Sequence, residues 1–335
     1  MPSSHESQSS RGPRAPWFVR VLRAIDKVKP WGDPYATASQ VYGDGSESSA
    51  YATELEDAFY RSMMLPNGTL KTTCAQRLTD VNRLVQQYLP DRRPVRIKDV
   101  AVSSGVSTLE WARELRESGI EAKMTATDLT IFALLVAFTD RLRVLFDSRG
   151  GVLQIDIAGY PAYPRLSGRV NRRLAGMPAR LAGWFVAGEL TKLTRSQAGQ
   201  RGGFVRQLEL VTPGVREAGI ELREEDLTDL GESEERWDVI RAANVLNRSY
   251  FGADELRGMV DSLVASLEIG GLLAVCRTDL GGMNHGSVWR SRADGTLELL
   301  GRVGRGSEIE DLVSDRQNLS ASAGDPQAGR SLPIG

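Results

Sequence analysis

The chain has 335 residues, of which 41% are hydrophobic, and its 42 Lys and Arg against 43 Asp and Glu give a formal net charge of −1. This composition suffices for a full hydrophobic core, and the balanced charge excludes the strongly basic class of nucleic-acid-binding domains, so we expect no nucleic-acid partner. Two distant cysteines, Cys74 and Cys276, exclude a recognisable zinc site or disulfide framework, and no uncharged apolar run reaches about 18 residues, so we expect a cytoplasmic protein without a bound metal.

The N-terminal part reads as a tail followed by helices. Residues 1–16 are rich in Ser, Arg and Pro and are predicted to be a disordered tail. Residues 17–92 are predicted to form a helical cap that contains helices over 46–64 and 70–89. Within this cap, residues 17–28 carry apolar side chains on one helical face and basic ones elsewhere. That pattern is typical of a helix packed on its own domain or of one that makes peripheral contact with an anionic membrane.

A strand, a turn of small residues, a helix and a second strand follow one another between Ile97 and Asp128. The first strand is expected over 97–102, and Ser103, Ser104 and Gly105 end it. A helical pattern follows up to Gly119, and residues 122–127 form the second strand, which ends on Asp128. The predicted unit is β-α-β.

In such a unit the first turn and the helix N-terminus face a ligand, and an acid at the end of the second strand reaches the hydroxyls of a ribose. Asp128 stands at that position. Of the glycines that a pyrophosphate-binding turn requires, only Gly105 is present, and Ala101 and Ser103 occupy the other places. We therefore expect a nucleoside ligand without a pyrophosphate.

A long insertion, residues 131–215, precedes the third strand and is interpreted as a lid or substrate region. Residues 131–138 are predicted to be helical, and 142–157 to form a hairpin around 148–151. Residues 161–206 contain nine Lys and Arg against the single Glu189. This basic segment is expected either to meet anionic lipid or an acidic macromolecule, or to be a lid whose arginines pair with the acidic run at 217–235.

The remaining elements alternate between strand and helix. Strands are predicted at 220–223, 237–247 and 272–277, a helix at 253–268, a turn at Gly270-Gly271, and a hairpin from 287–290 and 296–303 around 293–295. The predicted fold is α/β, a Rossmann-like, doubly wound, seven-stranded sheet over 93–314, mostly parallel with an antiparallel C-terminal hairpin. Residues 315–335 are expected to be a disordered tail.

Four sequence stretches together resemble a known enzyme class. DVAVSSGVSTLEWARELRESGI, TATDL, EEDL and WDVIRAANVLN with LEIGGLLAVCRT are similar to class I S-adenosylmethionine-dependent methyltransferases. Within that class they distantly resemble the enzymes that esterify glutamate side chains of chemotaxis receptors, and the likeness covers about residues 95–280 without the insertion. It implies S-adenosyl-L-methionine as the cofactor.

The resemblance also implies a role for each matching residue. Ala101, Ser103 and Gly105 would line the methionine part of the cofactor, and Asp128, followed by Leu129, would bind the ribose. Asp226 and Leu227 would hold the adenine, and Asn244 would lie beside the cofactor at the end of the fourth strand.

The hypotheses for the function differ in the chemical group that accepts the methyl group. A carboxylate, on a small molecule, a peptide or an acidic protein, is ionised at neutral pH and needs only arginines to orient it. A hydroxyl of a small molecule or natural product needs a base, for which His285 is the candidate. We therefore expect His285, Arg248 and Tyr250 as candidate catalytic residues. A third reading is a noncatalytic, cofactor-binding adaptor at a membrane surface.

Overall fold

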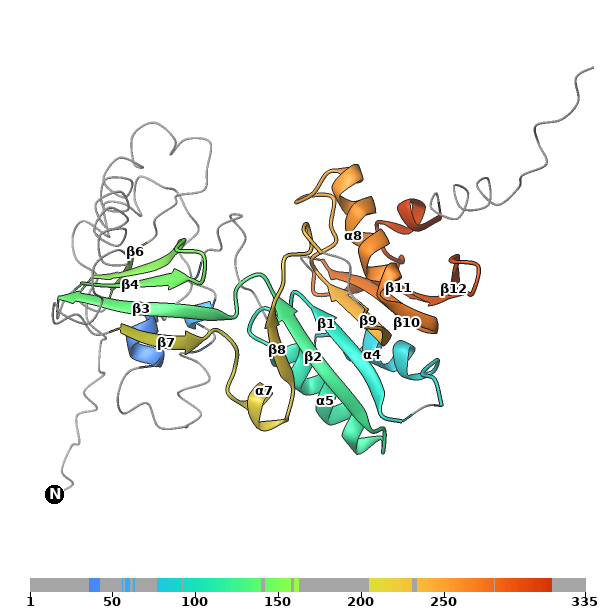
Figure 1. Ribbon diagram of the computed structural model, residues 1–335, viewed down its shortest axis with the longest axis horizontal. Helices are drawn as coiled ribbons and strands as arrows, with labels where there is room; N and C mark the ends of the chain where they lie inside the picture. Colours follow the sequence, from blue (N-terminus) through green and yellow to red (C-terminus); the bar gives the residue numbers. More distant parts are fainter. Residues whose placement is uncertain are drawn as a thin grey trace, which may run out of the picture. The chain divides into compact units, whose positions relative to one another are not determined.

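The computed structural model describes residues 36–42, 56, 58–60, 63, 77–91, 93–139, 142–157, 160–162, 205–230, 234–279 and 281–314 (Figure 1). The chain divides into two compact units, one of residues 1–71 and 133–208, the other of residues 72–132 and 209–335. The predictions for the two tails, for the helix at 17–28 and for most of the basic segment concern residues outside this description.

The second unit is built on a seven-stranded sheet. Its strands are β1 (Val95–Val100), β2 (Ala122–Asp128), β8 (Glu221–Glu224), β9 (Trp237–Ala243), β10 (Leu267–Thr278), β11 (Asn284–Ser291) and β12 (Leu297–Val303), in the order β12-β11-β10-β9-β1-β2-β8. The pairs β8–β2, β2–β1, β1–β9 and β9–β10 are parallel, and β11 runs antiparallel to both of its neighbours. This is the predicted doubly wound sheet with an antiparallel C-terminal hairpin.

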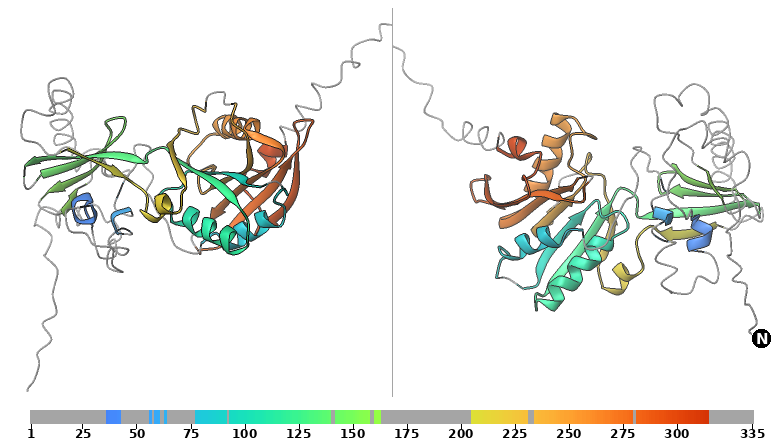
Figure 2. Two further views of the ribbon diagram at one scale, coloured as in Figure 1. Left: turned by 60° about the horizontal axis from the view of Figure 1, so that its bottom comes forward. Right: turned by 180° about the vertical axis from the view of Figure 1, so that it is seen from behind.

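Helices cover both faces of this sheet, so nearly every residue of its inner strands β1 and β9 is buried. On one face α5 (Val106–Glu117) packs on the sheet with α4 (Thr79–Gln86) and α7 (Gly214–Glu217). On the other face lies α8 (Ala253–Ala265) (Figure 2). The alternation along β9 shows the two layers, because Val239 joins the core beneath α5 and Ile240 joins the core beneath α8.

The first unit contains a five-stranded sheet. Its strands are β3 (Phe132–Thr139), β4 (Leu142–Asp147), β5 (Val152–Ile157), β6 (Tyr160–Ala162) and β7 (Val205–Glu209), in the order β6-β5-β4-β3-β7. Within it, β3, β4, β5 and β6 pair antiparallel with one another in turn. The short helix α2 (Ala38–Val41) is bound to β5 through Gln154, a buried residue whose Oε1 accepts a hydrogen bond from the Ala38 N–H at 2.9 Å.

The predicted helix over 131–138 is wrong, because these residues form β3 and pair with β4. A short, uninterrupted apolar run has no periodicity that separates a strand from a buried helix. The predicted hairpin over 142–157 is confirmed by the pairing of β4 with β5. The predicted turn at Gly270-Gly271 is also wrong, since both glycines lie inside β10, where its register with β9 shifts between Leu267 and Leu272.

The predicted helix at 70–89 is confirmed over Thr79–Gln86, and the described residues 56 and 58–60 of the other predicted helix are helical. No helix among the described residues is long and apolar enough to cross a membrane.

Candidate functional site

The direction of the chain connections reverses at the carboxyl ends of β1 and β9. The chain leaves β1 through α5 toward β2, and it leaves β9 through α8 toward β10, on the opposite side. Because the two connections diverge, the ends of β1 and β9 form the point where doubly wound sheets bind their ligands.

Left-handed backbone marks the same point. Among the described residues, the non-glycine residues with positive φ are Ala101 (57°), Ser103 (59°) and Asn244 (62°). Ala101 and Ser103 follow β1, and Asn244 follows β9, whose register with β1 pairs Val100 with Ala242. This conformation costs an L-residue roughly 1–2 kcal/mol, and strain of this kind gathers at functional sites. The two residues that replace the expected glycines thus keep a backbone that glycine favours.

Asp128 contacts the turn that carries this strain. Its Oδ2 accepts a hydrogen bond from the Ser103 N–H at 2.7 Å, and its Oδ1 accepts one from the Thr130 N–H at 3.2 Å. The side chain is buried. Asp128 ends β2, the position at which an acid of a doubly wound sheet binds the hydroxyls of a ribose. Leu129, the next residue, is half-buried.

Asn244 presents an unused donor at the same edge of the sheet. Its backbone N–H binds the Cys276 oxygen at 2.8 Å, and its Oδ1 accepts from the Thr278 N–H at 2.7 Å. Its Nδ2 is buried and makes no hydrogen bond within the described part of the chain. A buried amide nitrogen without an acceptor is costly, and a ligand oxygen would relieve this cost.

A buried ion pair between Arg241 and Asp99 links β9 to β1, the two strands that lead to the site, and it was not predicted from the sequence. The Arg241 guanidinium, 1% exposed, binds Asp99 through Nε (2.9 Å) and Nη2 (2.5 Å), and it lies 4.2 Å from the centroid of the Trp111 ring. Thr108 Oγ1 donates to the same carboxylate at 2.6 Å. These contacts join β9, β1 and the first turn of α5. The signal was present in the sequence, where the charged residues Asp99 and Arg241 lie inside strands predicted to be buried.

Three consecutive acids follow or end β8. Glu224 Oε1 accepts the N–H groups of residues 131 and 132, and Asp226 Oδ1 accepts both the N–H and the Oγ1 hydrogen of Thr228. Glu225 lies beside the end of β2, since its N–H binds the Asp128 backbone oxygen at 2.9 Å. Leu227 is half-buried and packs against the core beneath α8.

His285 lies in β11. Its Nδ1 accepts the backbone N–H of Arg305 at 3.0 Å, so the ring proton belongs on Nε2, which is 3.2 Å from Asp279 Oδ2. The N–H of Met283 and the His285 ring hold the pKa of Asp279 below its usual value. Both ring nitrogens are therefore engaged.

The other two candidate catalytic residues follow β9. Arg248 is turned to Asp311, whose two carboxylate oxygens lie 2.6 and 2.5 Å from Nη2. Tyr250 is 57% exposed. Thus Asp128 binds the β1–α5 turn, and Asn244 lies at the same sheet edge. Arg248 instead forms an ion pair with Asp311.

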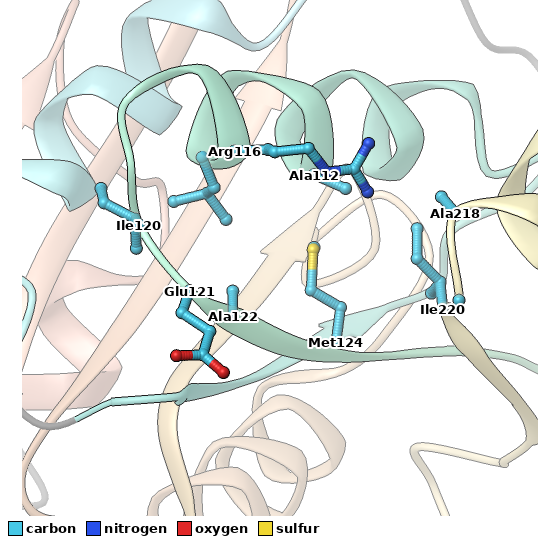
Figure 3. Close-up of a pocket in the computed structure, with 10 residues that line it drawn as sticks. Ala112, Arg116, Ile120, Glu121, Ala122, Met124, Ala218 and Ile220 are labelled. Carbon is cyan, nitrogen blue, oxygen red and sulfur yellow. The ribbon is translucent and has the colours of Figure 1, made fainter.

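A separate pocket of about 230 Å³ lies at the opposite, amino-terminal edge of the sheet (Figure 3). It is lined by the last turns of α5, the start of β2 and the residues before β8, and its wall combines the apolar Met124 and Ile220 with the charged Arg116 and Glu121. It is smaller than ordinary small-molecule sites.

No family model and no curated protein sequence matches the chain. Solved structures that align with it include an S-adenosylmethionine-dependent methyltransferase from Clostridium acetobutylicum (11% identity, 72% of this chain and 80% of that one, TM-score 0.31). An O-methyltransferase family protein from Burkholderia thailandensis aligns at 13% identity (73% and 46%, TM-score 0.30), and the [4+2]-cyclase SpnF at 14% (59% and 44%, TM-score 0.27). The chain thus spans less than half the length of the latter two. Similarity at this level assigns no activity.

Proposed function

We propose that the protein is an S-adenosylmethionine-dependent methyltransferase. The observation that carries the proposal is the convergence, at the carboxyl ends of β1 and β9, of three strained non-glycine residues, a buried amide donor and an acid bound to the β1–α5 turn. Strain and an unsatisfied donor are retained where a ligand uses them.

The residues present fit this cofactor. Asp128 is an acid at the end of β2, where the vicinal hydroxyls of a ribose would be bound, the turn at Ala101, Ser103 and Gly105 would bring backbone close to the ligand, and Asn244 Nδ2 offers a donor. When bound, the cofactor supplies an electrophilic methyl group. The chain would align the acceptor with that group and exclude water, which requires neither a metal nor a covalent nucleophile from the protein.

We propose a carboxylate as the acceptor, carried by a small molecule, a peptide or an acidic protein. A hydroxyl acceptor would require a base, and the only lone pair of the His285 ring is already used by the Arg305 N–H. A carboxylate needs no base. Arg305 supports this choice because it is exposed and because, in the described part of the chain, its guanidinium contacts His285 but no acid.

Calorimetry with S-adenosylhomocysteine tests the proposed cofactor. The wild type is expected to bind it, and Asp128→Asn to weaken binding by about tenfold to a hundredfold, because a hydrogen bond to a charged group contributes about 1.5–3 kcal/mol. Asp147→Asn is the matched control, since Asp147 is also buried and also accepts backbone N–H groups, but in the other sheet. Equal binding by Asp128→Asn and the wild type would remove the assignment.

Incubation with methyl-labelled cofactor and candidate acids tests the proposed acceptor. A methyl ester releases its label in mild base, and label that resists base would count against a carboxylate. Binding of the cofactor without any transfer of label would favour the adaptor reading instead.

A further inference from the structure

The buried ion pair of Arg241 and Asp99 joins the two strands whose ends carry the site, and it joins them at one register. The two residues are direct partners in the parallel pairing of β1 with β9. Asp99 is two residues before Ala101, and Arg241 is three residues before Asn244, so the pair closely precedes strained residues on both strands. A polar contact that forms at one register opposes slippage of one strand along the other.

The Arg241 guanidinium also binds α5 and α4. Its Nη2 donates to the Ser107 backbone oxygen at 3.4 Å, and Thr108 Oγ1 donates to the carboxylate that the guanidinium binds. Ser107 and Thr108 belong to the first turn of α5, which continues the strained turn after β1. Nη1 donates to Oδ1 of Asn82 in α4, whose Nδ2 donates to Glu114 of α5 at 2.8 Å. The network therefore connects two strands and two helices.

Stability alone does not account for this network. Arg241 is 1% exposed and Asp99 is 2% exposed. Removing two charges from water costs about as much free energy as their attraction gains, so apolar residues of similar volume are often equally stabilising or more so. Directional hydrogen bonds differ from an apolar core in that they fix one arrangement of the elements that they join. Here the elements so fixed are β1, β9 and the first turn of α5.

We infer that Arg241 is a positioning residue, which holds the β1–α5 turn and Asn244 in the conformation that binds the cofactor. This inference rests on the proposed function. Arg241 acts on the turn through Asp99 and the first turn of α5, and on Asn244 through the register of β9. Backbone strain persists only where the surrounding structure enforces it. Without the network the turn is expected to relax, so that only a fraction of the molecules can bind the ligand.

The test combines calorimetry with S-adenosylhomocysteine and hydrogen exchange of the ligand-free protein over residues 101–109. Asp99→Leu/Arg241→Met removes both charges and should fold. We expect it to bind at least about tenfold more weakly than the wild type, as for a turn that is competent no more than about a tenth of the time. The amides of Val102, Gly105 and Leu109, all hydrogen-bonded in the wild type, should exchange at least about tenfold faster.

Two further variants separate positioning from stability. Thr108→Val keeps the ion pair but removes the link of Asp99 to α5, so it should fold like the wild type and show both effects to a smaller extent. Leu263→Ala is the matched control, because it opens a cavity in the core beneath α8, on the other face of the sheet. It should lower the urea midpoint and keep the affinity within about twofold of the wild type.

Wild-type affinity in the folded double variant would overturn the inference, and so would faster exchange of the turn without a loss of affinity. An equal loss of affinity in Leu263→Ala would overturn it as well, because the effect would then follow stability. If the double variant does not fold, Thr108→Val decides by the same two measurements. A wild type that does not bind S-adenosylhomocysteine would instead refute the proposed function itself.

Discussion

Replacing Arg241 by methionine should destabilise the seven-stranded unit far more than loss of an ordinary ion pair. The substitution leaves the Asp99 carboxylate, which is 2% exposed, with the Thr108 hydroxyl as its remaining side-chain donor in the described structure. It also removes the contact of the guanidinium with the Trp111 ring. Breaking one half of a buried pair costs about 3–5 kcal/mol, because the other charge stays buried and uncompensated.

The double variant Asp99→Leu/Arg241→Met removes both charges, and we expect it to regain much of that loss. Arg257→Met is the control, since Arg257 pairs with Asp254 on the exposed surface of α8, and we expect a cost of no more than about 1 kcal/mol. The assay is a urea titration in which hydrogen exchange of peptides from β1 and β9 monitors unfolding. These peptides report on the seven-stranded unit alone. A cost for Arg241→Met as small as that for Arg257→Met would refute the reasoning.

Three further predictions concern backbone strain, thiol burial and acid stability. Ala101→Gly should stabilise the unit by roughly 0.5 kcal/mol, since glycine removes the left-handed strain. The control Ala112→Gly, in α5, should destabilise it by about 1 kcal/mol in the same urea titration. If both substitutions destabilised the unit, Ala101 would not be strained. Burial raises the pKa of the Cys276 thiol to about 12, so a Cys74→Ser variant should resist iodoacetamide at pH 8 until it unfolds, and rapid labelling of the folded protein would contradict this burial. Arg223 lowers the pKa of Glu235, so this pair stabilises the fold above about pH 4.5 and loses its effect as the pH falls through the lowered pKa. Glu235→Gln should therefore reduce the loss of stability between about pH 5 and 3 by no more than about 1 kcal/mol. If the variant and the wild type lost the same stability over this range, the pair would not contribute.

The β-α-β unit was predictable because each of its boundaries has a local chemical cause. Gly105 and Gly119 both adopt the positive φ that their places before and after α5 require. The C-terminal hairpin was predictable for the same reason, with Gly295 at positive φ in its turn. These are properties of a few consecutive residues, and the sequence displays them directly.

What the sequence did not reveal depends on contacts between distant residues. The apolar run of β3 becomes a strand because β4 pairs with it. The partner of Arg241 is Asp99, 142 positions away, and that of Glu225 is Lys98, 127 positions away. The pairing of Arg248 with Asp311 and the capture of the His285 Nδ1 by Arg305 are likewise tertiary. Residue type alone made Arg248 and His285 look available for chemistry.

The most direct test of the account is a crystal structure of the protein with S-adenosylhomocysteine. We predict that both ribose hydroxyls lie within hydrogen-bond distance, about 2.5–3.0 Å, of the Asp128 carboxylate, and that Asn244 Nδ2 donates to the ligand. A ligand that binds elsewhere, for example in the pocket at the amino-terminal edge of the sheet beside Met124, with Asp128 and Asn244 untouched, would contradict the account.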